Sequence, residues 1–220
     1  MKKVCFSFFC GLLMLVSIAL GAIVAAATTE RRVSGFYRSD FTKGIAYEGP
    51  MHLSTKGFTH YIYEDASLQT FRVALYSNEV IFIHTHGSAG YFFITPTVHV
   101  SKAVLDESNT PINSKLVYIS ACSAGLTSST SGNVCLALCN KGAETVVGFE
   151  DTVAASTGTD GIHRFNSLVV YKLVNGYTIS SAMSSALQQF MTEVYEETGE
   201  YDTYGADSYV IYGNGYLTIN

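Results

Sequence analysis

The chain has 220 residues, of which 48% are hydrophobic and only three are proline. This composition fits one compact domain and excludes a fibrous or intrinsically disordered protein. The 13 basic and 18 acidic residues give a formal net charge of −5 without any basic run, which argues against nucleic acid as a partner.

The first 27 residues have the order of a secretory signal peptide. A basic start, Met1–Lys3, precedes the apolar run Val4–Val24, and Ala25–Ala27 offers the small residues that signal peptidase accepts. We therefore expect cleavage near Ala27 and a single domain over residues 28–220 that is secreted or held at the cell surface. An uncleaved membrane anchor is the alternative, in which case this segment would be the chain's only contact with a membrane.

Residues 28–220 contain 11 basic residues, 18 acidic residues and three cysteines, which gives a net charge of −7. An odd number of cysteines does not fit a disulfide scaffold. Cys135 and Cys139 lie four residues apart on a predicted helix, where a bridge would be strained, so we expect two buried free thiols. Cys122 is the remaining thiol.

Apolar periodicity predicts alternating strands and helices along most of the chain. Residues 34–45 show no clear pattern and are left unassigned. The expected strands are 60–63, 80–83, 91–95, 116–120, 144–149, 208–212 and 216–219. The expected helices are 47–56, 67–76, 98–105, 133–141, 165–173 and 180–195. Strand–helix–strand units imply parallel pairing with right-handed crossovers, so we expect an α/β fold, a three-layer α/β/α sandwich with a mostly parallel central sheet.

Three of the expected buried strands end in polar or reactive residues. Val80–Ile83 leads into His84-Thr85-His86-Gly87, Leu116–Ile119 into Ser120-Ala121-Cys122, and Thr145–Phe149 into Glu150-Asp151. Ligands of open parallel sheets bind outside the carboxyl ends of the strands. The sequence therefore predicts a site along this edge of the sheet.

Cys122 and His86 are the candidate catalytic pair. A cysteine nucleophile needs a nearby base or positive field to become a thiolate. Neighbouring parallel strands lie about 4.8 Å apart, so residues at adjacent strand ends can meet. Gly87 lets the backbone approach a substrate carbonyl, and the N–H groups of Gly87 and Cys122 would supply the two donors of an oxyanion hole.

His84 and His86 alternate along the strand and so would share one face, as a pair of zinc ligands does. No third ligand follows at a characteristic spacing, so we expect no metal. His84 is instead expected to pack beside the site or to orient it.

The two short motifs together resemble the signature of the clan of cysteine peptidases that includes caspases, gingipains, legumain, clostripain, separases and CHAT-domain proteins. The motifs are an apolar strand ending in His86-Gly87 and, 36 residues after His86, an apolar strand ending in Ala121-Cys122. Gly142–Phe149 and Val210–Leu217 are similar to strands of the gingipain-like and CHAT members. The resemblance spans roughly residues 58–217.

This resemblance implies a caspase-like fold that hydrolyses peptide bonds of a polypeptide substrate without a metal or organic cofactor. Cys122 would attack the carbonyl carbon, His86 would protonate the departing amine, and Gly87 would help to hold the oxyanion. In this clan the segment after the strand that follows the cysteine lines the specificity pocket. Glu150 and Asp151 would therefore favour a basic residue before the scissile bond.

The chain departs from the family pattern in two places. No acidic residue immediately precedes Cys122, unlike in the arginine-specific clostripain pattern, which leaves the charge specificity open. The first strand of the usual sheet is not found before residue 58, so we expect a trimmed version of the fold.

Two other functions stay open. Ala121–Gly125 fits a loose nucleophile elbow, in which Ser123 would be the nucleophile of an α/β-hydrolase-type esterase and His86-Gly87 an oxyanion loop. Asp160 and His163 would complete that triad, although they lie only three residues apart and the chain is short for that fold. The second alternative is a catalytically silent, exported binding module that keeps only the fold.

Overall fold

The computed structural model describes residues 30–154 and 161–219, and contacts group residues 31–220 into one unit. The expected signal peptide, residues 1–27, lies outside the described residues, as does Asp160 of the esterase alternative. Within the described ranges, no helix combines the length and the apolar character needed to cross a membrane.

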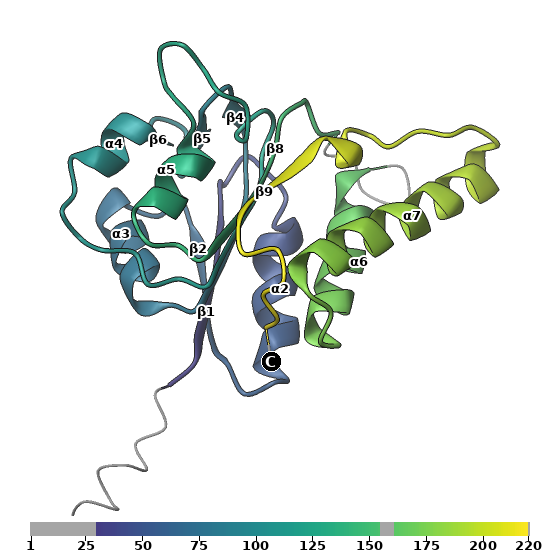
Figure 1. Cartoon of the computed structure of the whole chain (residues 1–220), viewed down its shortest axis with the longest axis horizontal. Helices are drawn as coiled ribbons and strands as arrows, with labels where there is room; N and C mark the ends of the chain where they lie inside the picture. Colours follow the sequence, from purple (N-terminus) through teal and green to yellow (C-terminus); the bar gives the residue numbers. More distant parts are fainter. Residues whose placement is uncertain (1–29, 155–160, 220) are drawn as a thin grey trace, which may run out of the picture. The chain divides into compact units, whose positions relative to one another are not determined.

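A six-stranded sheet forms the middle of this unit (Figure 1), and its strands have the order β2-β1-β3-β7-β8-β9. Its strands are β1 (Arg32–Tyr37), β2 (Thr59–Glu64), β3 (Val80–His84), β7 (Leu116–Ser120), β8 (Thr145–Phe149) and β9 (Tyr209–Gly213). The first five strands in this order are parallel, and β9 runs antiparallel to β8. Every residue of β3, β7 and β8 is buried, as expected for parallel strands with helices on both faces.

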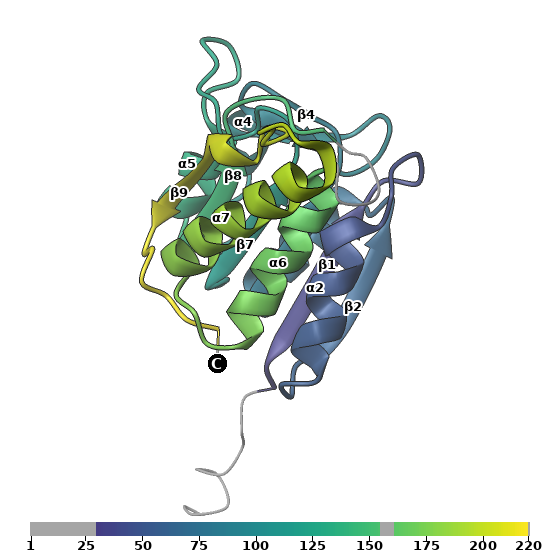
Figure 2. The same ribbon diagram turned by 90° about the vertical axis from the view of Figure 1, so that its right-hand side faces the viewer.

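Helices cover both faces of the sheet and give three layers (Figure 1), and Figure 2 looks onto one of the covered faces. One face carries α2 (Gly44–Ser54), α6 (Ile162–Val174) and α7 (Ile179–Thr198), and the other carries α3 (Leu68–Ser77), α4 (Lys102–Asp106) and α5 (Val134–Asn140). Right-handed crossovers explain why α2 lies on the face opposite α3, α4 and α5. The chain moves along the sheet in one direction from β1 to β2, and in the opposite direction from β2 through β3 and β7 to β8. The prediction of a mostly parallel α/β/α sandwich is confirmed.

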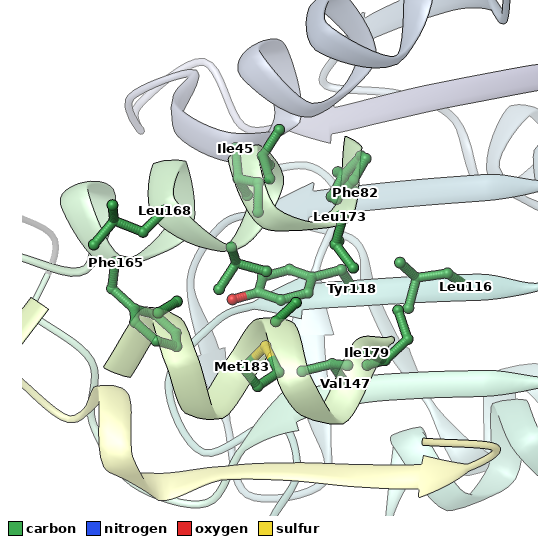
Figure 3. Packing of buried hydrophobic residues seen from close by; sticks show 14 of the residues in the cluster. Ile45, Phe82, Leu116, Tyr118, Val147, Phe165, Leu168, Leu173, Ile179 and Met183 are labelled. Atoms are coloured by element: carbon green, nitrogen blue, oxygen red, sulfur yellow. The ribbon is translucent and has the colours of Figure 1, made fainter. Parts of the chain in front are cut away.

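Two apolar clusters fill the spaces between the sheet and the helices. Figure 3 shows the cluster beneath α2, α6 and α7, where the fully buried Tyr118 of β7 lies among side chains from neighbouring strands and helices. The second cluster packs α3, α4 and α5 against the opposite face through residues such as Phe71, Leu105 and Leu138. Each large side chain buried in this way contributes about 1.5–3 kcal/mol, so the strands that carry the predicted site are firmly held.

The strand β1 shows that the expectation of a trimmed fold is wrong. It pairs with both β2 and β3, although Ser34 and Gly35 interrupt its apolar pattern. A side chain at Gly35 would lie 1.5 Å from the carbonyl oxygen of Ala46, so glycine is what lets α2 pack directly on this strand. Ser34 accepts a hydrogen bond from the buried Asn78 side chain.

The strand expected over 216–219 is also wrong, because no strand forms there. The carbonyl groups of Leu217 and Gly215 instead accept hydrogen bonds from the N–H groups of Ile179 and Ser180, both at 2.9 Å. Donors at the start of a helix lack partners within the helix, and this segment supplies them for α7. Ile219 is buried, which accounts for the apolar pattern without a strand.

A second, three-stranded sheet begins directly after His86. It consists of β4 (Gly87–Ser88), β5 (Tyr91–Phe93) and β6 (His99–Ser101). The helix expected over 98–105 is therefore shorter: the chain is extended until Ser101, whose side chain accepts a hydrogen bond from the Val104 N–H and caps α4. Capping of this kind fixes where a helix starts.

Candidate active site

His86 and Cys122 follow the carboxyl ends of two neighbouring parallel strands. In the register of β3 and β7, His84 lies opposite Ser120, and the Thr85 N–H extends the ladder by donating to the Ser120 carbonyl oxygen at 3.2 Å. A side-chain carbon added at Gly87 would lie 2.5 Å from the Cys122 carbonyl oxygen. The backbone after His86 therefore packs directly against the backbone at Cys122.

His86 is exposed, but its backbone is fixed. Its carbonyl oxygen accepts a hydrogen bond from the Phe93 N–H of β5 at 3.0 Å. Its imidazole ring packs edge-on against Phe41, with the ring centroids 4.6 Å apart. The neighbouring Asp40 binds the Arg38 guanidinium, and the hydrogen bond from Arg38, helped by the charge of His86, holds the pKa of Asp40 below its usual value.

Cys122 is a half-buried free thiol at the border of the apolar cluster under α6 and α7. Its Sγ lies 3.6 Å from the Val153 carbonyl oxygen, and the next residue, Ser123, donates its N–H to the Asp151 carbonyl oxygen at 2.9 Å. The segment after β8 thus runs alongside the cysteine. The side chains of Glu150 and Asp151 are both exposed there.

Cys135 and Cys139 are free thiols on α5, as the sequence predicts. Cys135 is fully buried, whereas Cys139 is half-buried. Burial raises the pKa of the Cys135 thiol above its ordinary range, so it behaves as an apolar core side chain and takes no part in the site.

The groups of the esterase alternative do not form an elbow. Ser123 has a left-handed backbone, φ +53, but the following helix starts only at Val134, whereas a nucleophile elbow turns from the strand straight into a helix. His163, on α6, contacts Thr42, with its Nε2 2.7 Å from the Thr42 Oγ1. Within residues 30–154 and 161–219, the serine hydroxyl that lies within hydrogen-bond distance of an imidazole is that of the buried Ser120, 3.0 Å from the Nδ1 of His84.

His84 lies beneath the exposed edge and is only 1% exposed. Burial, together with the neighbouring His163 and His86, lowers the pKa of His84 to about 3, so the ring is neutral at neutral pH. Its Nε2 lies 3.4 Å from the Thr42 Oγ1. Among the described residues, no group of three or more histidine, cysteine or acidic side chains has an arrangement that could hold a metal ion.

The loop between β1 and α2 brings Asp40, Phe41 and Thr42 to this edge, and the sequence patterns did not identify it. Its residues have no apolar period, and their contacts with His84, His86 and His163 join distant parts of the chain. The strand order reverses between β1 and β3, and ligands of open α/β sheets bind at such a switch point. Had β1 been recognised in the sequence, the loop that follows it would have been placed at this switch point.

No protein-family model and no curated protein matches this chain. Among solved structures, a complex of the Porphyromonas gingivalis RgpB pro- and mature domains matches with a TM-score of 0.61 and 12% identity, covering 86% of this chain and 48% of that chain. RgpB is a gingipain. The chain has a gingipain-like fold. It spans about half the length of the matched RgpB chain.

Two caspase structures also match this chain. One is of pro-Sf-caspase-1, with a TM-score of 0.48, 12% identity, and coverage of 86% of this chain and 93% of that chain. The other is of caspase-1 from Spodoptera frugiperda, with a TM-score of 0.45, 14% identity, and coverage of 84% and 87%. The gingipain match concerns the fold, and the chemistry must come from the site.

Proposed function

We propose that this protein is an exported cysteine endopeptidase in which Cys122 is the nucleophile and His86 the acid–base partner. The observation that carries the proposal is the close packing of Gly87 against the Cys122 carbonyl group. It holds the ends of β3 and β7 together, so an exposed imidazole and a thiol follow adjacent strands at the edge where open α/β sheets bind their ligands.

The chemistry is an acyl transfer in two steps. The Cys122 thiolate attacks the scissile carbonyl carbon, and the C–N bond breaks as His86 gives a proton to the leaving amine. Water then attacks the thioester, with His86 taking its proton, and hydrolysis releases the carboxylic acid and the thiol. The N–H groups of Gly87 and Cys122 stabilise the oxyanion; within the described residues the Cys122 N–H donates to no backbone carbonyl, so it remains available.

The substrate is a polypeptide, and the reaction requires no metal or organic cofactor. Glu150 and Asp151 favour a basic residue before the scissile bond, since both carboxylates are exposed on the segment beside Cys122. A signal peptide ending near Ala27 exports the enzyme. Sequencing the N-terminus of the protein recovered from the medium of an expressing cell tests this part, and retention of Met1 on a membrane-bound product would support an anchor instead.

The catalytic test compares the full chain with its Cys122→Ala, His86→Ala and Ser123→Ala variants on peptide and ester substrates. Cys122→Ala should abolish peptide hydrolysis, and His86→Ala should lower kcat by at least about 100-fold. Ser123→Ala is the matched control and should keep the peptidase activity. Full activity of Cys122→Ala would show that the cysteine mechanism is wrong. Loss of hydrolysis in Ser123→Ala, but not in the other two variants, would favour the esterase. A wild type inert to all substrates, whose Cys122 reacts no faster than a free thiol, would favour a silent binding module.

A further inference from the structure

His86 must hold its ring toward Cys122 and the leaving amine, yet its side chain is exposed. Within the described residues the imidazole forms no hydrogen bond, and Phe41 is the one aromatic ring that contacts it, at 4.6 Å and an interplanar angle of 71°. An exposed side chain without a partner samples several rotamers. The contact with Phe41 therefore restricts the orientation of this ring.

Phe41 stands between two histidines. Its second edge-on contact is with His84, with centroids 4.8 Å apart and an interplanar angle of 62°. The loop that carries Phe41 is itself closed by a hydrogen bond from the Phe41 N–H to the Arg38 carbonyl oxygen, at 3.0 Å. Edge-on pairs of this kind contribute about 0.5–1.5 kcal/mol beyond their burial.

His84 is held by a directed chain of buried hydrogen bonds. The Tyr118 hydroxyl donates to the Asn166 Oδ1 at 2.8 Å, and the Asn166 Nδ2 donates to the Ser120 Oγ at 2.9 Å. Because Ser120 accepts from Asn166, its own proton is free to be donated to the His84 Nδ1, 3.0 Å away. With Nδ1 accepting from Ser120, the proton of the neutral His84 ring is on Nε2, which lies 3.4 Å from the Thr42 Oγ1.

The neutrality of His84 also suits the reaction. A positive charge here would oppose the imidazolium form of His86 that protonates the leaving amine. The other charged or titratable groups around these rings are His163 on α6, which contacts the His84 ring, and Asp40 and Arg38 on the loop beside His86. Glu48 lies near His163.

We propose that Phe41 and His84 are positioning residues that orient the His86 imidazole, with Phe41 as the contact and His84 as its anchored support. This inference rests on the proposed cysteine-peptidase function and adds residues to its machinery. A misplacement of about 1 Å in a catalytic group can cost about 100-fold in rate. Loss of the Phe41 ring should therefore lower kcat by about 10- to 100-fold while KM stays nearly unchanged, since neither residue needs to touch the substrate.

The test uses the full chain and ring-specific variants. Phe41→Leu keeps apolar bulk but removes the ring, and Phe41→Tyr keeps the ring and should restore kcat. His84→Asn retains an acceptor for Ser120 while removing the part of the ring that faces Phe41, so it should reproduce the Phe41→Leu effect. Tyr171→Ala, at a 62% exposed aromatic residue on α6, is the control and should match the wild type in kcat and KM.

A double-mutant cycle of Phe41 and His86 distinguishes positioning of the ring from general destabilisation of the fold. The rate at which iodoacetamide alkylates Cys122 should fall in Phe41→Leu and in His86→Ala, and the double variant should react no more slowly than His86→Ala alone. If the two substitutions lower the alkylation rate additively, Phe41 does not act through His86 and this inference is wrong. It is also wrong if the wild type is active and Phe41→Leu has the same kcat. In both cases the proposed peptidase function is unaffected. A wild type that cleaves no peptide would overturn the proposed function and this inference together.

Discussion

Gly87 lies against the carbonyl group of Cys122 at a distance that only glycine allows. A Cβ at this position would be 2.5 Å from the Cys122 carbonyl oxygen and 2.9 Å from the Ala121 Cβ. Gly87 therefore has two roles in the proposed mechanism. Its N–H is an oxyanion donor, and its missing side chain lets the two strand ends with the catalytic pair come together.

Gly87→Ala should separate these strand ends. The methyl group meets backbone atoms rather than a flexible side chain, so the His86 segment must move, and kcat/KM should fall by about 100-fold. The stability cost of such overpacking is about 1–3 kcal/mol. Peptide hydrolysis and urea unfolding measure the two effects separately.

The matched control is Gly57→Ala, where an added methyl group has no atom within 4 Å but the backbone is left-handed, at φ +85. It should lose about 1 kcal/mol of stability from backbone strain and keep the wild-type kcat/KM. Equal activity of Gly87→Ala and wild type would contradict the close packing of the two strand ends.

Tyr118→Phe should destabilise the fold through Asn166. Tyr118 and Asn166 are both fully buried, and the lost hydroxyl leaves the Asn166 Oδ1 without its donor (Tyr118 in Figure 3). An unsatisfied buried acceptor costs about 1–3 kcal/mol, which denaturant unfolding would detect. Tyr216→Phe, at an 85% exposed tyrosine, should change the free energy of unfolding very little, and a similar result for Tyr118→Phe would argue against the buried network.

The stability of the protein should fall on mild acidification because of His84. Its pKa is lowered from 6.5 to about 3 in the folded state, so between these values the unfolded chain binds more protons than the folded one. Above pH 6.5 His84 is neutral in both states, so its burial costs no free energy of unfolding through protonation. As the pH falls from 6.5 toward 3, protonation of the unfolded chain progressively lowers the free energy of unfolding. At pH 5, where ordinary carboxylates are still largely ionised, the loss from His84 is about 2 kcal/mol, and His163, whose pKa burial also lowers, acts in the same direction.

Urea unfolding at pH 7.5 and pH 5 measures this loss. His84→Asn should reduce the loss of stability between the two pH values and leave the share of His163, whereas His52→Asn, at an exposed histidine on α2, should not change it. A wild type equally stable at both pH values would show that His84 does not remain neutral in the folded protein.

The core strands and the positions of His86 and Cys122 at the sheet edge were predictable from the sequence because both follow from local order. β3, β7 and β8 are continuous apolar runs, and His86 and Cys122 come directly after two of them. Parallel strands place such residues at one edge whatever the details of packing. The chain therefore encodes the position of these two residues within short segments.

The loop with Asp40, Phe41 and Thr42 could not be predicted in the same way. Its importance arises from contacts with His84, His86 and His163, more than 40 residues away in the chain, and no local pattern records them. β1 was not predicted for a related reason. Gly35 interrupts its apolar pattern, and a glycine is required there because the Ala46 carbonyl group of α2 packs against it. Positions chosen for tertiary contact lack the apolar period on which sequence reasoning depends.

Glu150 and Asp151 have exposed carboxylates on the segment beside Cys122. The double variant Glu150→Gln/Asp151→Asn keeps the shape and removes both charges. Since each exposed ion pair contributes about 0.2–1 kcal/mol, the preference for arginine or lysine over leucine before the scissile bond should fall by up to about 30-fold. It should also weaken in high salt, which screens exposed charges.

Measuring kcat/KM on three peptides that differ only at this residue tests the charge preference. Glu144→Gln is the control, because it neutralises an exposed carboxylate next to the opposite end of β8 and should leave the three values unchanged. Equal turnover of all three peptides by the wild type would remove the basic specificity while leaving the Cys122 mechanism intact. If the double variant still prefers arginine or lysine over leucine, the acidic groups that bind the basic side chain lie elsewhere on this edge of the sheet.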